Sequence, residues 1–179
     1  PELQAQGKEF LASMGIYIFS KPAIKKLFDD DDGAVDFGKQ IIPAAINGGY
    51  RVASYAYDGY WEDIGTIEAF YDCNIAITDD IPEFNLFENK NIIFTRPRML
   101  GPSKFIGTQI NTAVVAEGCI IHADQIDKSL IGLRSRIGEG TIVKETITFG
   151  NDYFETLDEV TYPVQIPMGI GEQCHIERC

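Results

Sequence analysis

With 179 residues and 45% hydrophobic content, the chain is long and apolar enough for one domain, or two small ones, with real cores. Its 27 acidic and 15 basic residues give a formal net charge of −12, so we expect neither nucleic acid nor a membrane surface as a partner. The sequence has no long apolar run and no signal-peptide pattern, and its cysteines lack metal-site spacing, which together predict a soluble intracellular protein.

The first third of the chain predicts alternating strands and helices. Residues 12–19 and 50–57 are rich in apolar and β-forming side chains, which is typical of strands buried in a sheet. Between them, apolar residues at helical spacing predict two short amphipathic helices, around 22–28 and 41–46. The aspartates at 29–32 are interpreted as a solvated helix end and are given no function.

The segment 60–66, Tyr-Trp-Glu-Asp-Ile-Gly-Thr, lies where the second predicted strand meets a third predicted helix. Ligands of α/β folds bind in the crevice outside the carboxyl ends of the strands, so Asp63 is a candidate for chemistry. The alternative is that Asp63 merely closes a turn. Thr66 is a candidate N-cap, and Glu68 complements the helix dipole. The predicted inward face of this helix consists of Ile67, Phe70, Tyr71, Asn74 and Ile75.

Prolines and polar residues after this helix interrupt every periodic pattern and predict a connector. Within the connector, residues 92–94 predict a short strand. Arg96 and Arg98 place two cations beside Pro97. These arginines either bind an anion or belong to an ordinary solvated turn.

From about residue 110 a new period appears, in which aliphatic residues recur six positions apart and small residues follow four positions later. Such hexads build a parallel β-helix, whose short strands turn corners and stack their aliphatic side chains into an inner column. The interval between residues 121 and 131 is irregular, and the segment 151–167 is interpreted as a loop inserted into one coil. The aliphatic positions are Val115, Ile121, Ile131, Ile137, Val143, Ile170 and Ile176, and the small ones are Cys119, Ser135, Thr141 and Cys174.

Several stretches of the chain resemble, in the same order, motifs of the ADP-glucose pyrophosphorylases (glucose-1-phosphate adenylyltransferases). They are Ala12-Ser13-Met14-Gly15-Ile16-Tyr17, Asp36-Phe37-Gly38 with Ile41-Ile42-Pro43, the segment 60–66, Pro97-Arg98, Ser129-Leu130-Ile131-Gly132 and Gly169-Ile170-Gly171-Glu172. Together they span essentially the whole chain. The Trp-x-Asp-x-Gly-Thr pattern is shared by related sugar-nucleotide pyrophosphorylases, so it does not choose among them.

The resemblance implies an α/β nucleotidyltransferase (Rossmann-like) portion followed by a left-handed parallel β-helix of hexapeptide repeats. We place the C-terminal portion of the nucleotidyltransferase domain at 1–90, a connector at 91–109, and a truncated β-helix domain at 110–179. The family's Gly-rich nucleotide loop and first metal aspartate have no counterpart in this sequence. We therefore expect the chain to be a piece of a longer enzyme that does not turn over alone.

The implied reaction transfers adenylyl from ATP to glucose 1-phosphate, giving ADP-glucose and pyrophosphate for glycogen or starch synthesis, with Mg²⁺ as cofactor. Asp63 matches one of two metal-binding aspartates, a role suited to Mg²⁺, which takes few protein carboxylates and leaves its other positions to phosphates and water. The residues that match the glucose 1-phosphate pocket are Ser13, Tyr17, Asp36, Phe37 and Trp61. Arg96 and Arg98 match a region that resembles an anion-binding regulatory site of part of the family.

Other interpretations stay open. Tyr17 and Phe37 are also compatible with plain core aromatics, and Asp36 with an N-cap only. The parent is alternatively a non-catalytic regulatory subunit or a pyrophosphorylase for another sugar. A hexapeptide-repeat acyltransferase, using His122 or His175 as a base, is a further alternative. The family also implies a homo- or hetero-oligomer, a tetramer in the parent family, in the cytoplasm of a bacterium or the plastid of a plant.

Overall fold

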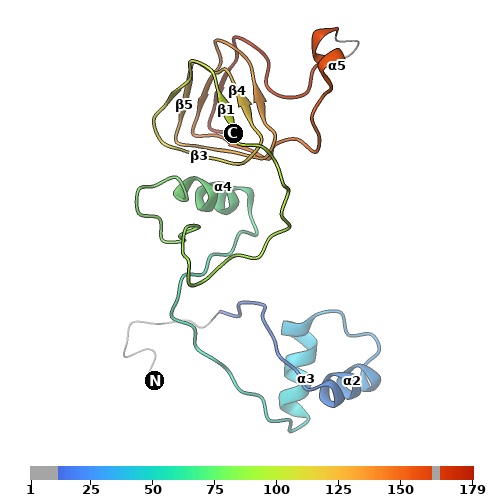
Figure 1. The fold of residues 1–179 in the computed structure, drawn as a ribbon. Helices are drawn as coiled ribbons and strands as arrows, with labels where there is room; N and C mark the ends of the chain where they lie inside the picture. The colour runs from blue at the N-terminus through green and yellow to red at the C-terminus, as the bar shows by residue number, and fades with distance from the viewer. Residues whose placement is uncertain (1–11, 163–165) are drawn as a thin grey trace. The chain divides into compact units, whose positions relative to one another are not determined.

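The computed structural model describes residues 12–162 and 166–179, and the chain forms two compact units, Pro1–Trp61 and Glu62–Cys179 (Figure 1). Among the described residues we find no helix with the length and apolar character needed to cross a bilayer. The division between the units falls earlier in the chain than the predicted domain boundary at residue 90, because helix α4 (Ile67–Ala76) packs with the β-helix.

The first unit contains helix α2 (Lys21–Asp30), a π-helical turn (Phe37–Ile41) and helix α3 (Ile42–Asn47). Both predicted helices are therefore confirmed. Pro22 lies in the first turn of α2, where its missing N–H costs no hydrogen bond. A small apolar cluster of Leu27, Ile41 and Ala45 holds these elements together.

The two predicted strands of this unit are wrong. Residues 12–19 and 50–57 form no ladder with any described residue, and Ile18 and Tyr55 are 98% and 88% exposed. An apolar, β-rich segment becomes a strand only where a neighbouring segment satisfies its N–H and C=O groups, and no described segment does so here. The Rossmann-like layer is therefore not confirmed. The short strand predicted at 92–94 is likewise absent from this irregular stretch.

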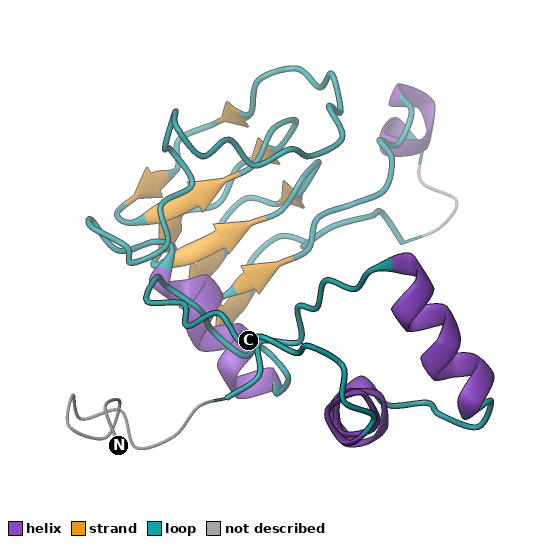
Figure 2. Ribbon diagram, turned by 90° about the horizontal axis from the view of Figure 1, so that it is seen from below, coloured by secondary structure: helices purple, strands orange, loops and turns teal. Residues whose placement is uncertain are grey.

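The second unit is a parallel β-helix with three sheets, ordered β1-β4-β7, β10-β8-β5-β2 and β3-β6-β9. Every pairing is parallel, and each strand bonds to the one a full coil away (Figure 2). The strands are β1 (Lys104–Phe105), β2 (Gln109–Ile110), β3 (Ala113–Val115), β4 (Ile120–Ile121), β5 (Gln125–Asp127), β6 (Ser129–Ile131), β7 (Arg136–Ile137), β8 (Ile142–Lys144), β9 (Ile147–Thr148) and β10 (His175–Glu177).

Aliphatic residues stack inside this β-helix as the hexads predict. Ile121 pairs in register with Ile137, which bridges to Ile170, and Val115 pairs with Ile131. A third column, Ile110, Ile126, Val143 and Ile176, contains two residues that the hexad pattern missed. Ile126 explains the irregular interval, since it lies midway between Ile121 and Ile131 and is fully buried. The core is therefore continuous through that coil.

The predicted small residues satisfy backbone groups at the corners. Cys119, Ser135 and Thr141 are buried. Ser135 Oγ donates to the carbonyl of Gly132 at 2.8 Å, and Thr141 Oγ1 donates to the carbonyl of Gly171 at the same distance. A larger side chain at position 135 or 141 would break these hydrogen bonds. Gly132 is required for a related reason, because a Cβ there would overlap the backbone of Phe149 in the next coil.

The predicted loop at 151–167 does leave the β-helix, between β9 and the bridge at Ile170, and part of it lies outside the described residues. It contains helix α5 (Leu157–Thr161), which the sequence analysis did not predict. A capping box stabilises this short helix. Thr156 Oγ1 accepts from the N–H of Glu159, whose carboxylate accepts from the N–H of Thr156.

Candidate functional site

Asp63 lies in a tight turn directly before α4. Its Oδ1 accepts a hydrogen bond from the N–H of Gly65 at 3.1 Å, and a side chain at position 65 would crowd that oxygen. Thr66 then caps the helix, as predicted, by accepting from the N–H of Ala69 at 3.1 Å. The side chain of Asp63 is solvent-exposed. Asp63 therefore closes a turn and at the same time presents a carboxylate to solvent.

Asp63 is one accessible carboxylate and does not by itself make a complete metal site. The described residues contain no group of three His, Cys, Asp or Glu side chains that could hold a metal ion. A single accessible carboxylate is nevertheless what Mg²⁺ commonly takes from a protein when phosphates and water fill its other positions. Asp63 is thus chemically suited to contribute one ligand.

Three of the predicted sugar-side residues lie together in the first unit. Ser13 Oγ and the Tyr17 hydroxyl are 2.8 Å apart, and the Tyr17 ring stacks on Phe37 at 5.8 Å between centroids. Tyr17 and Phe37 are 37% and 40% exposed, so neither is a fully buried core aromatic. Phe19 and Phe28 also contact this stack, with centroids 5.8 and 6.1 Å from that of Phe37. The result is a firm aromatic wall that carries hydroxyl groups at one edge.

Asp36 has the N-cap role that was the alternative to sugar binding. Its Oδ1 accepts from the N–H of Lys39 at 2.8 Å, and its Oδ2 lies 3.9 Å from the ammonium of the same residue. Trp61, at the end of the first unit, is 41% exposed. Asp63 belongs to the second unit. Arg96 and Arg98 are exposed within an irregular segment.

The two histidines of the β-helix, His122 and His175, lie in different surroundings. His122 is half-buried and contributes a ladder hydrogen bond through its N–H to the carbonyl of Ile137. His175 lies on the exposed strand β10, with Nε2 3.4 Å from Glu177 Oε2.

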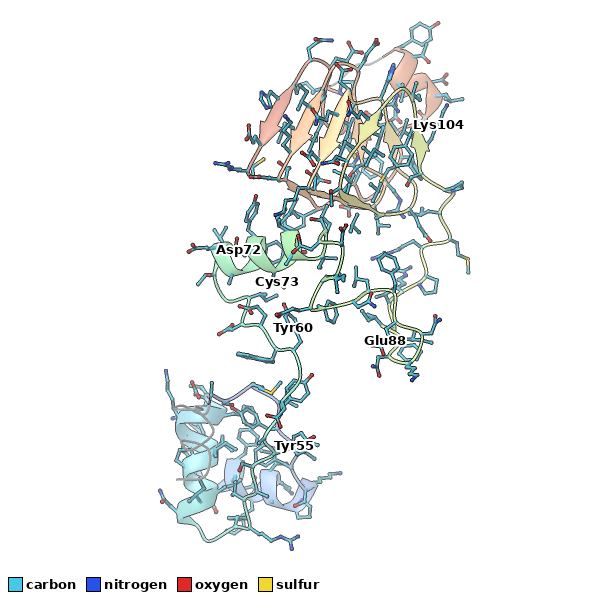
Figure 3. All side chains as sticks on the ribbon, turned by 90° about the vertical axis from the view of Figure 1, so that its left-hand side faces the viewer. Tyr55, Tyr60, Asp72, Cys73, Glu88 and Lys104 are labelled. Atoms are coloured by element: carbon cyan, nitrogen blue, oxygen red, sulfur yellow. The ribbon has the colours of Figure 1, made fainter. Side chains whose placement is uncertain are left out.

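Helix α4 docks on the β-helix through residues whose partners the sequence did not reveal. The hydroxyl of Tyr71 donates to the carbonyl of Glu145 at 2.6 Å, and the ring of Phe70 lies 5.9 Å from that of Phe149. The inward face was predicted correctly from Phe70 onward, whereas Ile67 is 90% exposed. Figures 2 and 3 show α4 lying along the β-helix, and Figure 3 labels Asp72 and Cys73 on it.

Two charged side chains, Glu145 and Arg178, lie near the hydroxyl of Tyr71 and affect its pKa. Burial raises the pKa of Tyr71, the nearby Glu145 carboxylate raises it further, and Arg178 opposes the shift. Arg178 Nε in turn donates to Glu145 Oε2 at 2.8 Å. The phenol therefore stays protonated at neutral pH and remains a donor.

Comparison with known proteins finds two family matches along the chain. The nucleotidyl transferase family model matches residues 1–80, and the model of the GLGC left-handed parallel beta-helix domain matches residues 98–179. A glucose-1-phosphate adenylyltransferase small subunit, chloroplastic/amyloplastic, of Triticum aestivum is 44% identical over 182 residues, which is 99% of this chain. The chain belongs to the glucose-1-phosphate adenylyltransferase family.

Membership of this family fixes the handedness of the β-helix as left-handed and places α4 in the nucleotidyl transferase match. The chain covers 38% of the length of the wheat protein. In this chain, α4 thus falls by sequence in the nucleotidyl transferase match and by packing in the unit that contains the β-helix.

Proposed function

We propose that the full-length protein transfers the adenylyl group of ATP to glucose 1-phosphate, producing ADP-glucose and pyrophosphate for glycogen or starch synthesis. The observation that carries this proposal is the similarity to the wheat adenylyltransferase subunit, which extends over 99% of the chain and so includes the segment 60–66. The exposed Asp63 carboxylate supports it, because charge builds up on the phosphates during the transfer.

In this reaction an oxygen of the sugar phosphate attacks the α-phosphorus of ATP, and pyrophosphate leaves. Asp63 would hold Mg²⁺ together with an aspartate from outside this chain, and the Asx turn to Gly65 would keep its carboxylate oriented. Mg²⁺ would supply charge neutralisation at the phosphates. Carboxylates alone would repel them.

The predicted sugar-binding residues of the first unit are proposed to bind glucose 1-phosphate. The hydroxyls of Ser13 and Tyr17 can hydrogen-bond to sugar hydroxyls, and the stacked Tyr17 and Phe37 rings form an apolar wall. Asp36 and Trp61 complete the proposed pocket. We further propose that Arg96 and Arg98 bind an anionic effector, since guanidinium groups suit phosphate or carboxylate.

We also propose that the protein works as an oligomer, because the wheat relative is described as a subunit. By the same comparison it would act in a plastid if the source is a plant. The alternative proposal, for a bacterial source, is the cytoplasm.

A substrate panel tests the activity. The full-length protein is expected to release pyrophosphate from ATP and glucose 1-phosphate with Mg²⁺, with ADP-glucose as the chromatographed product. GTP, UTP, and mannose or galactose 1-phosphate are expected to react far more slowly. Preference for another sugar phosphate would reassign the substrate. Absence of turnover, combined with stimulation of a second subunit, would identify a regulatory subunit instead.

The sugar-side role of Tyr17 can be separated from a packing role. Tyr17→Phe keeps the stack on Phe37 but removes the hydroxyl beside Ser13. We expect the KM for glucose 1-phosphate to rise about three- to tenfold, the effect of one lost hydrogen bond, with little change in thermal stability. Tyr55→Phe, at a position 88% exposed, is the matched control and should leave KM unchanged. An unaltered KM in Tyr17→Phe would leave Tyr17 as a packing residue only.

A further inference from the structure

Helix α4 connects two features that lie far apart in the sequence, the Asp63 turn and a corner of the β-helix. On the turn side, the Asp63 side chain bonds to the N–H of Gly65, and Thr66 bonds to the helix through its side chain and its carbonyl, which accepts from the N–H of Phe70 at 3.0 Å. These bonds make the turn an extension of the helix. Whatever orients α4 also orients Asp63.

On the β-helix side, the contacts near the start of α4 are few. Ile67 is 90% exposed, Phe70 is half-buried, and the buried residues, Ile75 and Thr78, lie at or beyond the far end of the helix. Apolar packing has no preferred direction, so the contact between the rings of Phe70 and Phe149 would by itself let the beginning of the helix pivot. The hydrogen bond from Tyr71 to the carbonyl of Glu145 is directional and short, at 2.6 Å.

The acceptor is itself well fixed. Glu145 adopts a left-handed backbone conformation, with φ of 44°, at a corner between β8 and β9, and its N–H donates to the carbonyl of Asp127 in the preceding coil at 3.0 Å. The carbonyl that receives the Tyr71 hydroxyl therefore has its place set by the stacked coils.

We propose that Tyr71 is a positioning residue, through which the β-helix holds α4 and so fixes the orientation of the Asp63 carboxylate. This inference rests on the proposed role of Asp63 in binding Mg²⁺. Tyr71 touches neither substrate nor metal in this arrangement. Its effect reaches Asp63 through the cap at Thr66 and the turn at Gly65.

The test compares three variants of the full-length protein. Tyr71→Phe removes the donor, whereas Glu145→Gln removes the ion pair with Arg178 but keeps the accepting carbonyl. Tyr162→Phe changes an exposed tyrosine of the inserted loop and is the matched control. Two properties are measured: hydrogen exchange at the amides of Ala69 and Phe70, and the Mg²⁺ concentration that gives half the maximal rate.

In Tyr71→Phe we expect both amides to exchange about fivefold faster, and the Mg²⁺ concentration for half-maximal rate to rise by a similar factor, with the KM for glucose 1-phosphate unchanged. The other two variants are expected to match the wild type in both measurements. Unchanged exchange in Tyr71→Phe would overturn the proposal. So would faster exchange with an unchanged Mg²⁺ requirement, which is the result for a purely structural contact.

The exchange measurement does not depend on catalysis, so it separates this inference from the proposed function. If Asp63→Asn leaves turnover intact while Tyr71→Phe still speeds exchange at Ala69, the metal role of Asp63 is what fails. If Asp63→Asn abolishes turnover and Tyr71→Phe changes nothing, the positioning role of Tyr71 is what fails.

Discussion

Asp63→Asn is expected to lower the kcat of the full-length enzyme by about 100- to 1,000-fold, because loss of one metal ligand forfeits several kcal/mol of charge stabilisation and each 1.36 kcal/mol is worth tenfold in rate. Asn keeps an oxygen that can accept from the N–H of Gly65, so the turn and the cap at Thr66 are retained. The midpoint of thermal unfolding should therefore barely change.

Steady-state kinetics over a range of Mg²⁺ concentrations checks this expectation. Asp72→Asn removes the same charge from an exposed position on α4 and serves as the matched control. A kcat in Asp63→Asn close to that of Asp72→Asn would show that Asp63 only closes its turn.

The largest effect on stability is expected at Ile126. Ile126→Ala removes atoms from a fully buried side chain that lies between Ile110 and Val143, in coils whose backbone is fixed by ladder bonds on both sides. Because such a site cannot collapse around the cavity, we expect a loss of about 2–5 kcal/mol in the free energy of unfolding. Chemical denaturation followed by the far-ultraviolet circular dichroism of the β-helix measures it.

Ile110→Ala is the control for that measurement. Ile110 belongs to the same column and pairs in register with Ile126, but it is 41% exposed. Its truncation should cost less than about 1 kcal/mol, since most surface-exposed changes are small. Equal losses at the two positions would mean that the inner column is not the main source of β-helix stability.

Much of the second unit is predictable from local sequence because its contacts repeat. Each coil places an aliphatic residue above its counterpart in the coil before, so the spacing of Ile131, Ile137 and Val143 reveals the architecture directly. The miss at Ile126 came from coils that are not strict multiples of six. The cap at Thr66 was predictable for a similar reason, since its bond is made within four residues.

The first unit is different because a strand depends on partners that its own residues do not specify. Residues 12–19 have strand composition, yet Ile16 and Ile18 are 75% and 98% exposed, and no described segment pairs with them. Propensity cannot substitute for a neighbour that accepts and donates hydrogen bonds. The π-helical turn before α3 was also beyond prediction from pattern alone.

The sequence by itself determined the β-helix, helices α2, α3 and α4 and the family, because each of these is encoded by short-range patterns or by order along the chain. It also singled out the segment around Asp63 as a candidate site. Only the tertiary structure decided that α4 packs on the β-helix and that Tyr71 meets the carbonyl of Glu145. That contact joins residues 74 positions apart. Its acceptor is a backbone carbonyl, which every residue has, so the residue type at position 145 does not reveal the contact. The orientation of the Asp63 turn is therefore a property of the folded chain.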